Sequence, residues 1–416
     1  MTKSYLITWL LTVCLCLVGI GVLNYLVDPY GLIETIRIDG FNDDKPAAAN
    51  RSYLFKPYQV IRRQPEILII GNSRPEMGLN PRHECLRKLG KVYSLTFPGT
   101  DMYMQARYLQ HAISGTSPLF VFIGIDFLDF LVPADSLVNP MQWPPRRSPQ
   151  EKRLLVTAEG DRNPDYGLAK FVDYRNSLIS LTALSDSIKT LGSQNTPYAV
   201  TRTAEGFNPA EGYYRNIIHT EGQGVLFAQK KQQLANRLKR NWGLMEGKHD
   251  WSRPLEALKH ILHWLNARDA RAIVFINPYH AEYLELIRQS GHWPLFERWK
   301  QLIVRLVTQE YQATLWDFSN FNRYTTEKPP PTGDLVKELK WFWEPAHYRD
   351  ELGQLILQTM LRDFGCKVDD SLTKPGIQLT RTNIDQHLKS QNQARLHYEM
   401  IHRDLIAAIR RLFDSS

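Results

Sequence analysis

The chain has 416 residues, of which 43% are hydrophobic and 23% charged, and this balance excludes both a disordered protein and one embedded in a membrane along most of its length. The formal net charge is +8, but lysine and arginine are scattered without a basic stripe interleaved with aromatic residues, which argues against nucleic acid as a partner. A basic surface fits an anionic membrane or an acidic polysaccharide equally well.

Residues 1–27 are predicted to be an uncleaved signal anchor. After Lys3 they carry no charged side chain, and at ~1.5 Å per helical residue they can cross a hydrocarbon core of ~30 Å. Trp9 and Tyr25 lie near the two ends, where aromatic side chains favour the interface, and no small-x-small cleavage site follows. With Lys3 before the run and Asp28 after it, the positive-inside rule places the N-terminus in the cytoplasm and the remaining chain outside it.

The next segment, residues 28–60, carries turn residues without a sustained period and is expected to form a stalk. Within a domain at 61–365, five short apolar segments have the pattern of buried parallel strands: 66–71, 92–95, 119–125, 271–276 and 313–318. Helical patterns alternate with the strands at 101–113, 226–244, 252–268, 281–308 (with a break near Gly291) and 350–363. This alternation predicts an α/β fold with a doubly wound parallel sheet.

A long insertion at residues 131–250 separates the third and fourth strands, and we expect it to form a cap or a substrate-facing lobe. Its aromatic side chains either stack on sugars or pack in a core: Trp143, Tyr166, Tyr174, Tyr213 and Tyr214. The tail at 366–416 contains an amphipathic helical pattern near 382–413. We expect this helix to pack back on the domain, and a partner-binding or membrane-surface helix is the alternative.

The four cysteines indicate no metal site. Cys14 and Cys16 lie inside the apolar N-terminal run, so only Cys85 and Cys366 remain for the folded domain, and nothing in their spacing decides whether they pair. The chain has no Cys-x-x-Cys pair and no clustered histidine and carboxylate spacing such as His-Glu-x-x-His. We therefore expect neither a metal nor a cofactor.

Ligands of open parallel sheets bind outside the carboxyl ends of the strands, so the residues that follow each strand are the candidate site. Ser73 follows the first strand, where a strand-to-helix turn would present its hydroxyl beside helix N–H groups that stabilise an oxyanion. Gly99 precedes the next helix and would offer an unobstructed N–H. Gly-Asn-Ser and Pro-Gly are also ordinary turn sequences, which is the alternative for both positions.

The third and fourth strands are followed by further polar residues. We expect Asp126, after the third strand, to form a charge-assisted pair with Arg74, and its alternative role is to cap the segment that follows. Asn277 and His280 follow the fourth strand and are expected to line a substrate cleft.

Glu344 and His347 stand after the last predicted strand, directly before a helix. His347 has the chemistry of a general base, and Glu344 three residues earlier would hold its Nδ1–H and fix the tautomer. The alternative is a helix cap beside a surface histidine. The placement favours the catalytic interpretation, because a serine follows the first strand and Glu-x-x-His follows the last.

This arrangement resembles the SGNH (GDSL-type) hydrolase superfamily, and in particular the membrane-anchored SGNH-like proteins of bacterial polysaccharide acetylation, such as the alginate acetylation proteins and the DltD family. The resemblance covers the anchor and roughly residues 60–365, and these segments carry it: Ile70-Gly71-Asn72-Ser73-Arg74, Pro98-Gly99, Gly124-Ile125-Asp126-Phe127, Trp316-Asp317-Phe318 and Glu344-Pro345-Ala346-His347-Tyr348. It implies a flavodoxin-like (SGNH-type) sheet, with Ser73 as the nucleophile, Gly99 as the oxyanion glycine and His347 as the base.

The sequence departs from the family pattern at two positions. Glu344 replaces the usual aspartate of Asp-x-x-His, and Asp126 stands in the region of the usual oxyanion asparagine. A carboxylate facing an oxyanion opposes catalysis unless Arg74 neutralises it. Asn72 is the candidate substitute donor.

The resemblance implies a serine O-acyltransferase or esterase that acts on a cell-surface or exported polysaccharide, anchored in the bacterial inner membrane with most of the chain in the periplasm. A membrane-bound acyltransferase is the expected protein partner. The alternative, which the two departures favour, is a catalytically inactive SGNH-like protein that binds glycan or assembles with such an acyltransferase.

Overall fold

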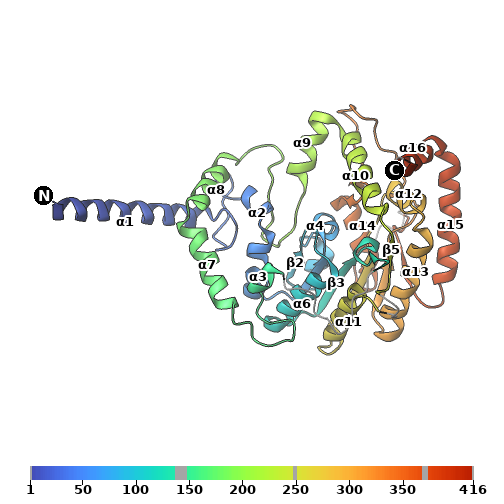
Figure 1. The fold of residues 1–416 in the computed structure, drawn as a ribbon, viewed down its shortest axis with the longest axis horizontal. Helices are drawn as coiled ribbons and strands as arrows, with labels where there is room; N and C mark the ends of the chain where they lie inside the picture. The colour runs from blue at the N-terminus through green and yellow to red at the C-terminus, as the bar shows by residue number, and fades with distance from the viewer. Residues whose placement is uncertain (1, 136–147, 247–250, 368–372, 415–416) are drawn as a thin grey trace.

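The computed structural model describes residues 2–135, 148–246, 251–367 and 373–414. Its centre is a six-stranded sheet in the order β10-β7-β6-β3-β1-β2 (Figure 1). The strands are β1 (Ile67–Gly71), β2 (Val92–Thr96), β3 (Phe120–Ile125), β6 (Arg271–Ile276), β7 (Thr314–Asp317) and β10 (Ile377–Leu379). All pairings are parallel except that of β10 with β7, which is antiparallel. The predicted α/β fold with a mainly parallel sheet is confirmed, and β10 is an unpredicted addition from the tail.

Both faces of the sheet are buried, which explains why the strands are continuously apolar. Side chains of β1 alternate between two hydrophobic clusters, with Leu68 and Ile70 in one and Ile67 and Ile69 in the other. The larger cluster is built with helices α6 (Met102–Gly115), α11 (Arg253–Asn266), α12 (Ala281–Gln289) and α13 (Trp293–Val304), and the smaller with α5 (Glu84–Arg87) and α14 (Asp350–Met360). All of these helices except the short α5 coincide with predicted helical segments.

Helix α1 (Thr2–Val27) projects from the domain as a single rod (Figure 1). Among the described residues, Lys3–Val27 is the one helix long and apolar enough to cross a membrane. Its inner end is part of the domain. Asn24 is buried, donates to the carbonyl of Leu178 at 2.8 Å and accepts from the Ser187 hydroxyl at 2.8 Å.

Lys45 closes the carboxyl end of α1. Its buried ammonium donates to the carbonyl oxygens of Val27 at 2.9 Å and Asp28 at 2.8 Å. Val27 is the last residue of α1, so its carbonyl has no N–H partner within the helix. A cation is favoured there by the negative end of the helix dipole. Burial lowers the pKa of Lys45 to about 8, against the opposing charge of Asp28.

Residues 28–60 differ from the predicted stalk, because they pack on the domain. They contain α2 (Pro46–Ala49) and the start of α3 (Ser52–Arg63), whose Phe55 and Tyr58 form a small core with Tyr30 and Leu32. The helical period of α3 is short and is interrupted by a proline, so it is difficult to distinguish from turn sequence.

The insertion at 131–250 has two parts in different places, rather than one lobe. The hairpin of α7 (Tyr166–Ile179) and α8 (Leu181–Gly192) lies against the inner end of α1 (Figure 1). The helices α9 (Glu211–Glu221) and α10 (Gln223–Leu238) pack on each other, and α10 packs on α12. Two short strands, β4 (Val132–Pro133) and β5 (Trp242–Gly243), pair with each other where the insertion leaves and rejoins the domain.

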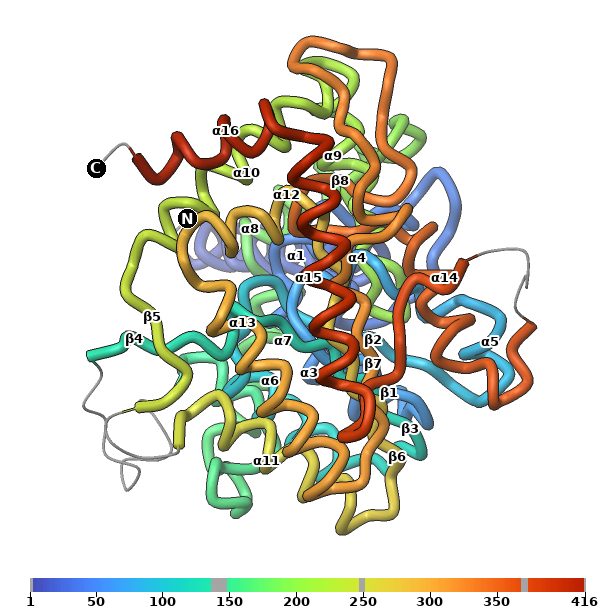
Figure 2. The backbone as a smooth tube through the Cα atoms, turned by 90° about the vertical axis from the view of Figure 1, so that its right-hand side faces the viewer, coloured from blue at the N-terminus to red at the C-terminus, as the bar shows by residue number. Residues whose placement is uncertain are grey.

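The predicted C-terminal helix is present as two helices, α15 (Ile384–Ile401) and α16 (Arg403–Asp414), which meet at His402. Both pack back on the domain, as expected: α15 covers α13 and α16 covers α12 (Figure 2). A buried ion pair fixes α15, since Lys300 Nζ lies 2.6 Å from Asp317 Oδ2 at the end of β7 and 3.1 Å from Gln391 Oε1 on α15. His387 of the same helix also contacts Asp317 Oδ2, at 2.8 Å.

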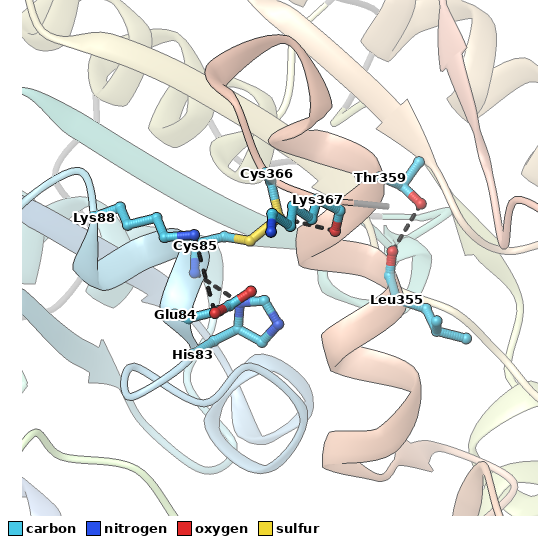
Figure 3. The surroundings of a disulfide bond; sticks show 8 residues. All are labelled: His83, Glu84, Cys85, Lys88, Leu355, Thr359, Cys366 and Lys367. Carbon is cyan, nitrogen blue, oxygen red and sulfur yellow. Dashed lines mark hydrogen bonds and ion pairs between the residues drawn. A yellow bond between two sulfur atoms is a disulfide. The ribbon is translucent and has the colours of Figure 1, made fainter. Parts of the chain in front are cut away.

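Cys85 and Cys366 form a disulfide, which answers the question that their spacing left open. The two Cα atoms are 5.3 Å apart, and the bond joins α5 to the segment that follows α14 (Figure 3). It links residues 281 positions apart in sequence. Cys14 and Cys16 are free on the exposed surface of α1.

Replacing Cys366 by serine is expected to lower the free energy of unfolding by about 2–5 kcal/mol, because the unfolded chain regains the freedom that this long loop closure removes. The measurement is chemical unfolding of the detergent-solubilised full chain, with and without reductant. Cys14→Ala is the control and leaves stability unchanged, since its thiol has no bond to lose. Equal stability of Cys366→Ser and the parent would contradict a disulfide in the folded protein.

Candidate active site

Ser73 stands at the first turn of helix α4 (Ser73–Gly78), directly after β1. Asn72 caps this helix, because its Oδ1 accepts from the N–H of Arg74 at 3.0 Å. Gly71 allows the turn to be tight, since a Cβ there would lie 2.5 Å from Pro75 Cγ. The predicted strand–turn–helix is therefore present, and it leaves Ser73 partly exposed at the carboxyl end of the sheet.

The site lies where the strand order reverses. The chain passes from β1 to β2 on one side and returns to β3 on the other, so β1 and β3 are neighbours at the switch point. Parallel sheets open a crevice at such a point. Ser73 follows one of these two strands and Asp126 the other.

Ser73, His347 and Glu344 form a continuous chain of contacts. Ser73 Oγ lies 2.7 Å from His347 Nε2, and His347 Nδ1 contacts Glu344 Oε1. The acid and the histidine face each other across a small antiparallel hairpin of β8 (Phe342–Glu344) and β9 (His347–Tyr348). This network assigns the proton of the neutral imidazole to Nδ1, which leaves Nε2 as the acceptor for the serine hydroxyl.

Glu344 is buried and ionised. Burial alone would raise its pKa, but the charge and hydrogen bond of His347, the ammonium of Lys230 at 3.6 Å and the N–H of Ala346 lower it to about 2. The Ala346 N–H donates to Glu344 Oε2 at 2.7 Å, so both carboxylate oxygens are held. Glu344 therefore reaches the histidine despite its extra methylene.

The stacked rings of Tyr214 and Trp343 lie beside the acid–histidine pair. The hydroxyl of Tyr214, on α9, lies 3.4 Å from His347 Nδ1, and its ring stacks on Trp343 with centroids 5.2 Å apart. Burial, and then the charge of Glu344, raises the pKa of Tyr214 well above its ordinary value, so its hydroxyl stays protonated. The sequence pointed to Tyr214 only as one aromatic residue of the insertion, and it contained no signal for Lys230.

The hairpin is held against α4 by glycine contacts. A Cβ on Gly78 would lie 1.9 Å from Tyr348 Cε2, so the ring of Tyr348 occupies the place of a side chain on α4. On α14, a Cβ on Gly353 would lie 1.6 Å from the Gly78 carbonyl oxygen. These close approaches fix the position of His347, next in sequence to Tyr348, relative to Ser73.

Arg74 and Asp126 form the predicted ion pair, with Nη1 2.9 Å from Oδ2. Arg74 also donates to the Ala346 carbonyl at 2.9 Å and to the Tyr283 hydroxyl at 3.1 Å. One guanidinium thus neutralises the buried carboxylate after β3 and fixes the loop that carries His347. The neighbouring Asp129 has a raised pKa, because it is buried and lies close to the charge of Asp126.

Asn72 does not have the position of an oxyanion donor. Its amide donates to Asp126 Oδ2 at 2.5 Å and to Asp129 Oδ2 at 2.8 Å, so both of its N–H bonds are engaged. The backbone N–H of Ser73 belongs to the first helical turn, which has no acceptor inside the helix. Gly99 has a φ of +67° and lines a groove that also contains Ser73 and His347. A Cβ at Gly99 would meet nothing within 4 Å.

The structure does not place Asn277 and His280 in the cleft, contrary to the prediction. Both are fully buried: the Asn277 amide donates to the Ile125 carbonyl at 3.2 Å, and its oxygen accepts from the Tyr348 hydroxyl at 3.1 Å. His280 caps α12 and contacts the Glu327 carbonyl at 2.8 Å. Side chains at a strand end alternate between the cleft and the interior, and the sequence position alone does not say which applies.

A groove of about 1040 Å³ opens over Ser73 and His347. It runs from the start of α6 along α10 to β5 and the start of α11, and Lys230, Arg237 and Arg253 contribute to its walls. Of the aromatic residues of the insertion, Tyr166 and Tyr174 are elsewhere, packed on Tyr58. Tyr213 is exposed on α9 and does not line this groove, and Trp143 lies outside the described residues.

The esterase chemistry that the sequence leads us to expect predicts that replacing Glu344 by glutamine lowers turnover by about 10²–10⁴-fold, because the amide leaves the imidazole in the wrong tautomer. Because the pKa of Glu344 is lowered to about 2, the carboxylate stays ionised at neutral pH and in mild acid. The measurement is the pH profile of turnover on an activated acetyl ester. The control is Glu351→Gln, a partly exposed acid on α14; equal losses in both variants would remove the orienting role of Glu344.

A scan against protein family models finds no match to this chain, and a search of curated proteins finds no relative.

Proposed function

We propose that this protein is an SGNH-type serine acyl-transfer enzyme, an O-acyltransferase or esterase, in which Ser73 is the nucleophile, His347 the general base and Glu344 the orienting acid. The observation that carries the proposal is the 2.7 Å contact between Ser73 Oγ and His347 Nε2, in line with a buried carboxylate and open to a groove. Nucleophile and base within hydrogen-bond reach, with the base held by a third group, is the arrangement of an activated serine.

The reaction proceeds through an acyl-enzyme. Ser73 Oγ attacks the carbonyl carbon of the acyl donor while His347 Nε2 takes the hydroxyl proton, and the backbone N–H groups of Ser73 and Gly99 stabilise the oxyanion. When the intermediate collapses, the bond to the leaving oxygen breaks and His347 returns the proton to that oxygen. A hydroxyl of the acceptor, or water, then attacks the ester by the same steps, and Ser73 recovers its proton.

A cell-surface or exported polysaccharide is the proposed acceptor or substrate. The support is the resemblance to membrane-anchored SGNH-like proteins of polysaccharide acetylation and a groove far longer than an acyl group requires. The order β2-β1-β3-β6-β7 of the parallel strands is that of flavodoxin-like sheets, which supports the SGNH-type fold. A membrane-bound acyltransferase is the proposed source of the acyl group.

The proposed location is the bacterial inner membrane, with α1 spanning it and the domain in the periplasm. The support is the length and apolar character of α1, with Lys3 at the end farthest from the domain, which the positive-inside rule places in the cytoplasm. The Cys85–Cys366 bond agrees with this side of the membrane, because disulfides persist in oxidising compartments.

The test is covalent labelling of the detergent-solubilised full chain with a fluorophosphonate, followed by mass spectrometry of the peptide that contains Ser73. Label on Ser73 that is lost in His347→Ala supports an activated nucleophile. An unlabelled Ser73 in protein that still shows a cooperative unfolding transition overturns the proposal.

One observation favours a second function, glycan binding without turnover. Asp126 stands near the oxyanion region, and the side-chain N–H groups of Asn72 are engaged by carboxylates, so Asn72 does not serve as an oxyanion donor. In that case Ser73→Ala leaves glycan affinity unchanged and no acyl-enzyme forms.

A further inference from the structure

The α7–α8 hairpin sits at the base of the apolar helix α1. Asn24 of α1 bonds to Leu178 of α7 and to Ser187 of α8, so the hairpin and the inner end of α1 are one packed unit. Figure 1 shows the two helices lying across the end of α1, on the side of the domain from which α1 projects.

The hairpin differs from the helices of a water-soluble domain, because it buries small and polar side chains and exposes large apolar ones. Its buried positions are small or polar: Ala169, Asp173, Ser177, Ala183, Ser187 and Thr190. Five large apolar side chains are exposed instead: Leu168, Phe171, Ile179, Leu181 and Ile188. Phe171 is 64% and Leu181 74% exposed. Several large apolar side chains exposed on one pair of helices favour a contact with another apolar phase.

The charges of the hairpin are sorted in the same direction. Asp173 turns inward to Arg153, and Asp186 turns inward to the Tyr30 hydroxyl at 2.9 Å. The charged side chains left exposed on the two helices are all cations: Lys170, Arg175 and Lys189. Exposed apolar residues flanked by lysine and arginine are typical of helices that lie in the headgroup region of an anionic bilayer.

The inner end of α1, which packs on both helices of the hairpin, also exposes apolar side chains. Tyr25 and Leu26 are about half exposed at the inner end of α1. Ile36, which is 83% exposed, lies beside them, because Asn42 donates both to the Leu26 carbonyl at 3.0 Å and to the Ile36 carbonyl at 3.1 Å. A helix of 26 residues is ~39 Å long, so its inner end extends beyond a ~30 Å hydrocarbon core into the interface.

We propose that the outer faces of α7 and α8, together with Ile36, lie in the interfacial layer of the same bilayer that α1 spans. The occupant of this surface is lipid, because both hairpin helices pack on the end of the apolar helix α1 and their exposed charges are cations that suit anionic headgroups. The domain is then held by three helices instead of one, with a fixed orientation to the membrane. The proposal rests on α1 as a membrane span and is independent of the chemistry at Ser73.

The test uses the full chain with Cys14→Ala and Cys16→Ala, in vesicles of phosphatidylcholine and phosphatidylglycerol that contain spin-labelled lipid. An environment-sensitive fluorophore is attached at Phe171→Cys and, separately, at Leu181→Cys. We expect blue-shifted emission and quenching of about two-fold or more at both positions, as for a probe that enters the acyl boundary. The matched control is Leu396→Cys, which is 56% exposed on α15 at the opposite end of the domain and is expected to stay unquenched.

A probe on Cys14, in a chain that retains only that free cysteine, reports whether α1 itself is in the bilayer. Unquenched Cys14 overturns the proposal together with the membrane span. Quenched Cys14 with probes at 171 and 181 that match the control at 396 overturns the interfacial hairpin alone. Blue-shifted but unquenched probes at 171 and 181 also overturn it, since a second copy or another protein then covers the surface. Fluorophosphonate labelling of Ser73 is read separately, so failure of one proposal does not imply failure of the other.

Discussion

Replacement of Ser73 by alanine is expected to lower hydrolysis of an activated acetyl ester by at least about 10³-fold, because in the proposed mechanism Ser73 is the nucleophile and the residues of a triad act as one unit. The fold should not change, since the hydroxyl of Ser73 has His347 as its partner and the turn is held by Asn72 and Gly71. The measurement is turnover of the full chain in detergent, with the unfolding midpoint as the check on folding.

The chain contains a matched control for this experiment. Ser290 Oγ lies 2.8 Å from His292 Nδ1, a second serine–histidine contact, but its hydroxyl also reaches the Ile287 carbonyl at 3.0 Å. With its proton held by that carbonyl, Ser290 has no general base, and Ser290→Ala is expected to retain full turnover. Equal turnover in Ser73→Ala and Ser290→Ala would show that hydrolysis does not pass through Ser73.

Replacement of Asp317 by asparagine is expected to lower the free energy of unfolding by about 3–5 kcal/mol, because it leaves the ammonium of Lys300 buried without its counter-charge. Both side chains are fully buried, and the pair joins β7 to α15 through Gln391 and His387. The measurement is chemical unfolding at neutral pH. Glu310→Gln, which removes the acid of an exposed pair with Arg305, is the control and should cost no more than about 0.5 kcal/mol.

The pH dependence of this loss has a definite sign. Burial alone would raise the pKa of Asp317, but Lys300 and then His387 hold it far below the usual value. A depressed pKa stabilises the folded state above the unfolded value of about 4, and the stabilisation is lost as the pH falls below it. The difference between the parent and Asp317→Asn should therefore shrink in acid. A difference that stays constant down to pH ~3 would contradict an ionised Asp317.

The strands and the site residues could be predicted because parallel strands are buried on both faces and end at one edge. Apolar runs therefore located β1, β3 and β7, and the rule for strand ends brought Ser73 and His347 together although they are 274 positions apart. The Arg74–Asp126 pair followed from the same rule. These features depend on local composition and on topology, both of which the sequence records.

Other features depend on contacts that leave no periodic pattern. β10 has three residues, and only Leu379 is buried, so it has neither the length nor the alternation of a predicted strand. The α7–α8 hairpin buries serine and aspartate. Its packed face therefore has no apolar periodicity from which the sequence could predict it. Tyr214 and Lys230 reach Glu344 and His347 from the insertion, and only the tertiary fold brings them there.

The cap that Lys45 places on α1 makes the stability of the domain depend on its apolar N-terminal helix. The carbonyl oxygens of Val27 and Asp28 are the acceptors of a buried ammonium, so a chain released from its anchor by cleavage before Asp28 loses one of them and the packing of Asn24 with it. An unsatisfied buried donor costs about 1–3 kcal/mol, and more when it is charged. Removal of α1 is thus expected to destabilise the domain, because Lys45 loses a partner and the contacts of Asn24 are lost with this helix.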